Sequence, residues 1–260
     1  MRLPIYQVDA FTDRLFGGNP ASIVPLDSWP PDATLQAIAA ENNLSETAYL
    51  VKRGGDYEIR WFTPAIEADL CGHATLASAW AVFNLIEPGR DRVSFATRRA
   101  GTLTVERRGD LLAMDFPARP PEPLASIRAL ETALGATPRE TLKAVRDYVA
   151  VFASAEEVRR LTPDFRALRT FDPVIATAPG SGDVDFVSRF FAPSGGIDED
   201  PVTGSAHSTL IPFWAKRLAK DRLHARQISA RGGELFCEAK GDRVEIAGKA
   251  VLYLEGWITV

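Results

Sequence analysis

The sequence predicts an α+β fold made of two similar halves, and an internal repeat is the first observation behind this prediction. Residues 60–64 (RWFTP) return as residues 189–193 (RFFAP), in each case Arg-x-Phe-x-Pro. Each copy is followed by an acidic segment and then by a small-residue turn, at residues 71–74 and 203–206. The offset is 129 residues at the prolines and 132 at the glycines, so one copy carries a three-residue insertion. A self-similarity of about half the chain indicates two copies of one structural unit.

The second observation is the segment 74–86, which has almost no polar face. A helix that is apolar all round is buried on all sides, and a central helix wrapped by a curled, mostly antiparallel sheet fits that pattern. The turn before such a helix leaves its first N–H groups unpaired at the positive end of the helix dipole, which suits a carboxylate or phosphate ligand. A pseudo-two-fold axis between the halves would bring two helix N-termini to one cleft, and we expect the active site there.

The two halves are expected to be residues 1–116 and 117–260. The segment 117–123 contains four prolines and is predicted to be the linker between them. A chain of 260 residues is long enough for two such domains, each with its own core.

The elements of the first half follow from local patterns. A strand at residues 4–8 leads to a turn at residues 16–20, where glycine, asparagine and proline gather. The helical spacing of Leu35, Ile38 and Ala39, directly after two prolines, predicts a helix over residues 32–42. Apolar segments bounded by turn residues predict the remaining strands, at residues 21–25, 46–51, 57–63, 92–96, 101–107 and 111–116.

The second half is expected to repeat this scheme. Its main helix follows the second small-residue turn, over residues 206–218, and Pro212 within it should kink it. Two shorter helices are predicted at residues 126–134 and 155–161. Strands are predicted at residues 148–152, 173–178, 184–191, 227–230, 235–240, 243–248 and 251–258.

Composition excludes several classes of protein. The net charge is −4 and no basic run occurs, so we expect no nucleic-acid partner. No run of 18 apolar residues and no signal-peptide core occur, so we expect no membrane association. The only cysteines are Cys71 and Cys237, which favours a cytoplasmic location over a disulfide framework. A homodimer is expected because two-fold dimers are the commonest assembly.

A few side chains near the two turns could carry chemistry. Glu46 stands at the start of an apolar strand, where partial shelter from water would raise a carboxyl pKa and suit proton transfer, although a surface Glu beside a cap is the alternative. His73 could orient a substrate, act as acid or base, or cap its helix. Asp200 could hold a substrate ammonium or hydroxyl group, or brace the turn. Ser205 could donate to a ligand carboxylate or cap the following helix.

Other chemistries find no support in the motifs. Residues 204–207 are not G-x-S-x-G, so a nucleophile-elbow hydrolase is not indicated. Cys71 and His73 have no second ligand pair near them in the sequence, so zinc is not expected. Neither G-x-G-x-x-G nor G-x-x-x-x-G-K-[ST] occurs, so no nucleotide cofactor is expected either.

Four sequence blocks together resemble the phenazine-biosynthesis PhzF-like isomerase family. The blocks span nearly the whole chain: DAFT…GNPA (residues 9–21), NLSET (43–47), FTP…CGHAT (62–75) and EDPVTGSA (199–206). The resemblance implies a fold similar to diaminopimelate epimerase, with two alike halves, each a sheet curled round a central helix. It also implies that the last strand can cross back to the first half.

The resemblance also implies roles for particular residues. Glu46 matches the catalytic acid/base, with His73 and Asp200 as its active-site partners. The substrate-binding positions it implies are Asn19, Gly72, Gly204 and Ser205. The family reaction is the isomerisation of trans-2,3-dihydro-3-hydroxyanthranilate, in which one carboxylate moves a proton between ring carbons without a cofactor. We therefore expect a cofactor-independent isomerase acting on a small carboxylate-bearing substrate.

One departure leaves alternatives open. Diaminopimelate epimerase uses a cysteine at each of the two turns, whereas here Cys71 stands at the first and Thr203 at the second. A two-thiol racemase is therefore not expected, because racemisation needs a base on each face. An amino-acid-type epimerase that uses Cys71 with another base is one alternative, and a non-catalytic metabolite-binding protein is another.

Overall fold

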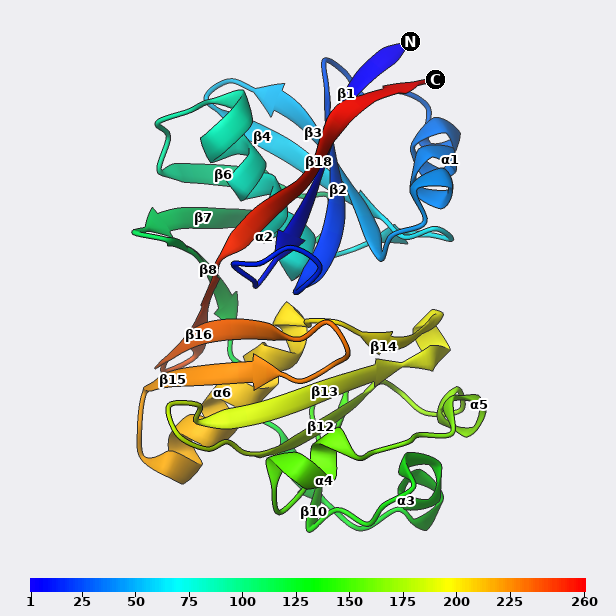
Figure 1. Ribbon diagram of the computed structural model, residues 1–260, viewed down its shortest axis with the longest axis vertical. Coiled ribbons are helices and arrows are strands. Elements are labelled where there is room, and N and C mark those ends of the chain that lie inside the picture. Colours follow the sequence, from blue (N-terminus) through cyan, green and yellow to red (C-terminus); the bar gives the residue numbers. More distant parts are fainter. The chain divides into compact units, whose positions relative to one another are not determined.

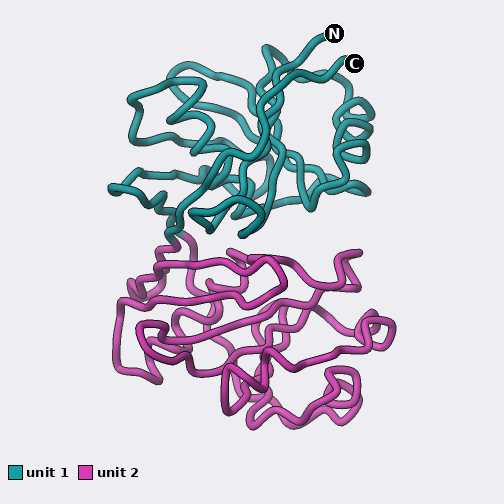
Figure 2. The backbone as a smooth tube through the Cα atoms, in the orientation of Figure 1, with its two compact units in different colours: residues 1–115, 247–260 teal, residues 116–246 magenta.

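The computed structural model describes residues 1–260 and divides into two compact units (Figures 1 and 2). Unit 1 comprises residues 1–115 and 247–260, and unit 2 comprises residues 116–246. The C-terminal segment belongs to unit 1 because β18 (Ala250–Thr259) pairs antiparallel with β1 (Arg2–Ala10) along its length. The division expected between residues 116 and 117 therefore lies one residue from the observed one, but the last fourteen residues fall in the first unit.

Unit 1 is a curved sheet with two helices. After β1 the strands are β2 (Asn19–Leu26), β3 (Glu46–Arg53), β4 (Asp56–Phe62), β5 (Glu67–Ala68), β6 (Arg92–Ala96), β7 (Thr102–Arg108) and β8 (Leu111–Pro117). The β2–β3 and β4–β6 pairs are parallel, and the other described pairs are antiparallel. Helix α1 (Asp32–Asn42) connects the parallel strands β2 and β3, and it has the predicted bounds.

Unit 2 repeats the pairing scheme of unit 1. Its strands are β9 (Glu122–Leu124), β10 (Glu140–Lys143), β11 (Tyr148–Val151), β12 (Val174–Pro179), β13 (Phe186–Ala192), β14 (Ile197–Asp200), β15 (Arg222–Gln227), β16 (Gly233–Lys240) and β17 (Arg243–Gly248). Parallel pairs again occur at the corresponding places, β11–β12 and β13–β15. Three short helices, α3 (Arg128–Leu134), α4 (Ala155–Arg159) and α5 (Phe165–Leu168), accompany this sheet. Two similar halves of α+β type are therefore observed.

The Arg-x-Phe-x-Pro repeat marks the same structural position in each unit. In unit 1 the Arg60 guanidinium donates two hydrogen bonds, of 2.7 and 2.8 Å, to the Glu67 carboxylate on the neighbouring strand. In unit 2 Arg189 donates two bonds of 2.8 Å to Glu199 in the same way. Each guanidinium also lies over the phenylalanine two residues later, about 5 Å from the ring centroid. The repeat is thus a conserved strand-to-strand brace within the chain, not a chance match of short strings.

Helix α2 (Gly72–Ala81) is the central helix of unit 1. Eight of its ten residues are buried, and it packs on β1, β2, β3 and β7. The helix begins two residues before the predicted start at residue 74, and its last turn, Val82–Ile86, is a π-helix. The Asn84 side-chain amide donates to the Trp80 carbonyl at 2.6 Å in this wider turn. Burial on all sides, expected from the missing polar face, is confirmed.

Helix α6 (Gly204–Leu218) is the corresponding helix of unit 2, and its structure explains Pro212. A proline has no N–H group, so the carbonyl of Ser208, four residues earlier, loses its helical donor. The backbone N–H of Arg119 supplies the missing bond to that carbonyl at 2.9 Å. Arg119 lies in the proline-rich segment predicted as a linker, so this segment is attached to the helix.

Some elements differ from the sequence-based prediction. The strand predicted at residues 227–230 is wrong: β15 ends at Gln227, and Ser229 forms part of a turn that its hydroxyl ties to the Pro201 carbonyl at 2.8 Å. The short strands β10 and β14 were not predicted, because their polar sequences contain no apolar run. A 3-10 turn, Pro193–Gly195, precedes β14. No helix has both the length and the apolar character needed to cross a bilayer.

Candidate functional site

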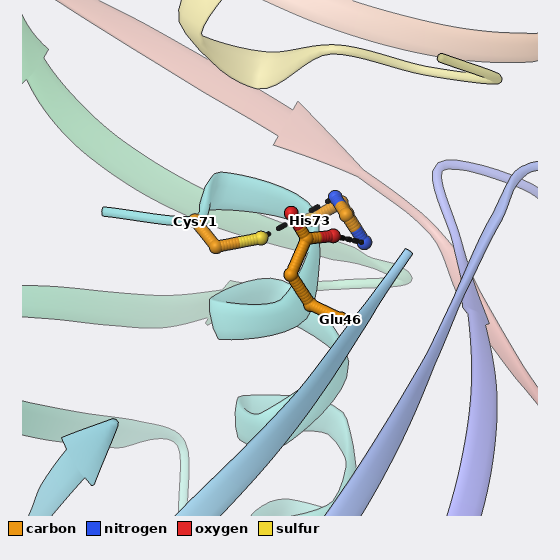
Figure 3. A group of neighbouring side chains, drawn as sticks. All are labelled: Glu46, Cys71 and His73. Carbon is orange, nitrogen blue, oxygen red and sulfur yellow. Dashed lines mark hydrogen bonds and ion pairs between the residues drawn. The ribbon is translucent and has the colours of Figure 1, made fainter. Parts of the chain in front are cut away.

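Three of the predicted site residues meet in unit 1 because two parallel strands begin beside the central helix. Asn19 is the first residue of β2 and Glu46 is the first residue of β3, and these strands pair side by side. His73 is the second residue of α2, which packs on both strands. Cys71, immediately before the helix, completes the group (Figure 3).

The hydrogen bonds of this group define the state of the imidazole. The Asn19 side-chain nitrogen donates to Nδ1 of His73 at 3.2 Å, so Nδ1 is an acceptor. The proton of a neutral ring then lies on Nε2, which is 3.2 Å from Oε2 of Glu46. Sγ of Cys71 is 3.5 Å from Nδ1. His73 therefore accepts at Nδ1, whereas its Nε2 lies close to Oε2 of Glu46 without the alignment of a hydrogen bond.

Burial keeps His73 uncharged. The side chain is only 6% exposed, and this burial lowers the pKa of His73 to about 3. The imidazole is therefore neutral at neutral pH. Glu46 is 14% exposed, so its carboxylate is sheltered but reachable.

The start of α2 presents backbone N–H groups to the same place. Cys71 is the N-cap residue, and its side chain makes no capping hydrogen bond to the first turn. No acidic side chain lies in that turn. Because neither a capping side chain nor an acidic residue takes the N–H groups from Gly72 onward, they are suited to a carboxylate ligand. The Cys71 carbonyl accepts from the Thr75 hydroxyl at 2.6 Å.

A strained loop positions Asn19. Phe11 and Phe16 have φ values of 63° and 67°, a left-handed conformation that bulky residues rarely adopt. Gly18 has φ +62°, and a Cβ there would lie 2.1 Å from the Ala10 carbonyl oxygen. Strain of this kind persists only where the surroundings enforce it and is concentrated at functional sites. Sequence reasoning missed Phe11 as a supporting residue, although it lies in the DAFT block.

Asp200 lies in unit 2, where its described contacts are with the turn before α6. Its carboxylate accepts from the Thr203 hydroxyl. The Gln227 side chain completes the arrangement, because it accepts from the Thr203 N–H at 2.8 Å and donates to the Asp200 carbonyl at 2.7 Å. Sequence reasoning missed Gln227, which was assigned to a strand. Asp200 thus braces the turn, one of the two roles considered for it.

Ser205 and Gly204 begin α6, whose N-cap residue also makes no side-chain capping bond. Nη2 of Arg146 donates to the Ser205 hydroxyl at 3.1 Å. Arg146 is half exposed and is paired with the buried Asp147 through a 2.8 Å contact. No sequence pattern pointed to Arg146, because its proximity to Ser205 comes from folding alone. The predicted site residues thus form two sets: Asn19, Glu46, Gly72 and His73 in unit 1, and Asp200, Gly204 and Ser205 in unit 2.

Comparison with known proteins identifies the family. The profile of phenazine biosynthesis-like proteins (PhzC-PhzF) matches residues 8–256. The chain belongs to this family. A Pseudomonas aeruginosa protein named as an uncharacterized isomerase is 52% identical over 257 residues, which cover 98% of both chains. The chain is accordingly an isomerase of the phenazine biosynthesis-like family.

Solved structures agree with the family and with the fold. A PhzF-family protein of Enterococcus faecalis superposes with a TM-score of 0.96 at 46% identity, covering 100% of both chains. A hydroxyproline epimerase from Agrobacterium vitis, 11% identical, superposes with a TM-score of 0.65 over 99% of this chain and 92% of its own. This second likeness concerns the fold alone. The predicted epimerase-like fold class is confirmed.

The repeat shows that three ionisable groups of this phenazine biosynthesis-like protein, Glu46, Cys71 and His73, have no ionisable counterpart in unit 2. Phe62 and Phe191 occupy the same position in the repeat. Phe62 pairs with Thr47, the second residue of β3, and Phe191 pairs with Val174, the first residue of β12. Thr47 and Val174 therefore correspond, which sets the residue-by-residue alignment of the two units. The unit 2 counterparts lack ionisable side chains: Pro173 for Glu46, Thr203 for Cys71 and Ser205 for His73. A carboxylate, an imidazole and a thiol therefore occur together only in the unit 1 copy of the turn.

Proposed function

We propose that this protein is a cofactor-independent isomerase that moves a proton between two carbons of a small carboxylate-bearing substrate, with Glu46 as the proton carrier. The observation that supports this proposal best is the contact between Glu46 and a neutral His73 at the N-terminus of α2. It combines a sheltered base, a fixed orientation and a set of backbone donors in one place.

In this proposal the Glu46 carboxylate removes a proton from a substrate carbon. The C–H bond breaks, the proton moves to the carboxylate, and the electron pair remains on the substrate as a delocalised anion. The N–H groups at the start of α2 stabilise that negative charge because they lie at the positive end of the helix dipole. Glu46 then returns the proton to a different carbon, so the enzyme ends in its starting state.

His73 and Asn19 orient the carrier. The Nε2–H of His73 lies 3.2 Å from one carboxylate oxygen and would donate to it after a small adjustment, and Asn19 fixes the ring tautomer through Nδ1. A neutral donor suits a proton carrier better than an imidazolium, because a charged partner would hold the carboxylate in its ionised form. On the resemblance to the family, Asp200 stays a predicted active-site partner of Glu46, and Gly204 and Ser205 stay predicted substrate-binding positions.

The test is proton NMR in D₂O with trans-2,3-dihydro-3-hydroxyanthranilate and a panel of small amino and hydroxy acids. We expect deuterium to enter one compound with the wild type and not with Glu46→Gln. Glu41→Gln is the matched control, because Glu41 lies exposed on α1 close to Glu46 in the sequence. Full turnover by Glu46→Gln on a confirmed substrate would contradict the proposal.

An epimerase that uses Cys71 is the second candidate, favoured by the 3.5 Å contact between Sγ of Cys71 and Nδ1 of His73. A thiol at a helix N-terminus is in a setting that promotes the thiolate, because the positive end of the helix dipole favours negative charge. Exchange at a stereocentre that is lost on alkylation of Cys71, with the product differing only in configuration, would favour this reading over proton transfer between two carbons.

A further inference from the structure

Three side chains in unit 1 bring together the ligand types of a zinc site. Glu46, Cys71 and His73 each offer one ligand atom, and these atoms all lie within 4.8 Å of one another (Figure 3). Cys71 and His73 are buried, at 6% and 5% exposure, and Glu46 is partly accessible. The sequence argued against zinc because only Cys71 and His73 are close in the chain, but the fold adds the missing third ligand.

The ligand atoms approach the separations of tetrahedral coordination, but Cys71 and Glu46 face different nitrogens of the His73 ring. Zinc bonds of ~2.0–2.1 Å to nitrogen or oxygen and ~2.3 Å to sulfur place a nitrogen and a sulfur ligand ~3.6 Å apart, and a nitrogen and an oxygen ligand ~3.4 Å apart. The corresponding observed distances are 3.5 Å from Sγ of Cys71 to Nδ1 of His73 and 3.2 Å from Oε2 of Glu46 to Nε2. Only one ring nitrogen can bind the ion, so binding requires a small shift of the Glu46 or Cys71 side chain.

The chemistry of the three side chains favours a particular metal ion. A thiolate, an imidazole and a carboxylate together suit zinc, whereas magnesium prefers oxygen ligands and octahedral geometry. Three protein ligands leave a fourth position for water.

We propose that Glu46, Cys71 and His73 bind a zinc ion that reversibly blocks proton transfer. Zinc takes the Cys71 thiolate and the Glu46 carboxylate, and the thiol proton is released to solvent, so binding strengthens as pH rises. No oxidation or reduction is involved. The inhibitory part of this inference rests on the proposed function of Glu46, while the binding part does not.

Binding is tested with protein that carries no histidine tag, titrated with Co²⁺ as a spectroscopic probe and then with Zn²⁺. We expect one Co²⁺ per chain, a thiolate-to-cobalt charge-transfer band in the near ultraviolet, and displacement by Zn²⁺ but not by Mg²⁺. Cys71→Ser should abolish the band and weaken zinc binding by roughly a hundredfold. Cys237→Ala, which removes the other buried cysteine, is the matched control and should keep both.

The results separate the two proposals. Failure of the wild type to bind one Zn²⁺, or equal binding by wild type and Cys71→Ser, would overturn the zinc site. Glu46→Gln gives a second check if Cys71→Ser does not fold, since loss of the carboxylate should also weaken binding while leaving the charge-transfer band. In an exchange assay, Zn²⁺ should inhibit the wild type and EDTA should restore it. A Cys71-dependent zinc site in a protein that retains full turnover as Glu46→Gln would instead refute the proposed function alone.

Discussion

Acid should destabilise both units well above the pH at which carboxylates titrate, because each unit contains a buried neutral histidine. Burial lowers the pKa of His73 to about 3 and that of His207 to about 4, from an ordinary value of 6.5. His207 lies in α6, and its Nδ1 donates to the Thr203 carbonyl at 2.8 Å. In the unfolded chain both rings take up a proton as the pH falls below about 6.5, whereas the folded protein excludes it.

The magnitude follows from proton linkage. A histidine whose pKa is depressed on folding contributes stability that is fully present above the unfolded pKa and is lost as the pH falls toward the folded pKa. Between pH 7 and pH 5 the loss is about 2 kcal/mol for each of the two rings. The carboxylates with lowered pKa values, such as Glu87 at about 2, are ionised in the folded and unfolded chains over most of this range and add their effect at lower pH.

Urea unfolding followed by tryptophan fluorescence at pH 7, 6 and 5 measures this effect. Trp61 in unit 1 and Trp214 in unit 2 are both buried and report on their own units. We expect the free energy of unfolding of the wild type to decrease steadily as the pH is lowered from 7 to 5. His73→Gln and His207→Gln should each reduce the dependence of the free energy of unfolding on pH by about half. This reduction is expected whether or not the substitution changes the free energy of unfolding at pH 7. A wild-type free energy that is the same at pH 7 and pH 5 would refute the assignment of neutral buried histidines.

Two further predictions concern stability, and both are measured by urea unfolding at pH 7. Arg60→Met should cost about 3 kcal/mol, because the guanidinium is 3% exposed and its loss leaves the partly buried Glu67 carboxylate with only the exposed Arg98 as a cationic partner. Arg99→Ala removes an ion pair in which Arg99 is 72% exposed and should change the free energy by less than about 0.5 kcal/mol. An equal effect of the two changes would contradict the bracing role of the repeated arginine. Gly248→Ala should cost about 1–3 kcal/mol, because the new Cβ would lie 2.4 Å from a ring carbon of Phe11. A Cβ at Gly256 would meet open space, so Gly256→Ala should leave the free energy of unfolding unchanged or raise it by up to about 1 kcal/mol. If Gly256→Ala cost as much as Gly248→Ala, backbone effects and not the contact with Phe11 would be responsible.

Local signals in the sequence determined a large part of the architecture. The apolar spacing after two prolines predicted α1 with its observed bounds, and the missing polar face of residues 74–86 predicted a buried helix. Such features depend on neighbours three or four residues away, which the sequence contains explicitly. The repeat located two matching turns, because the same brace of arginine and glutamate recurs in both units.

Tertiary structure decided which backbone groups of the polar segments form hydrogen bonds with one another. The strands β10 and β14 have little apolar pattern and exist because neighbouring strands pair with them. The sequence also gave no reason for Pro212, since the donor that replaces its missing N–H is Arg119, far away in the chain. Pairing between distant strands and carbonyls leaves no periodic mark, so these features could not be predicted locally.

The sequence by itself determined which residues of the unit 1 group to consider, since Glu46, His73 and Asn19 lie in recognisable blocks. Only the tertiary structure decided how these side chains contact one another and which of them are charged. The parallel alignment of β2 and β3 beside α2 brings Glu46 within 3.2 Å of an imidazole 27 residues away. Burial then keeps that imidazole neutral. Charge state depends on the surrounding dielectric and on contacts made by the folded chain, and neither exists before folding.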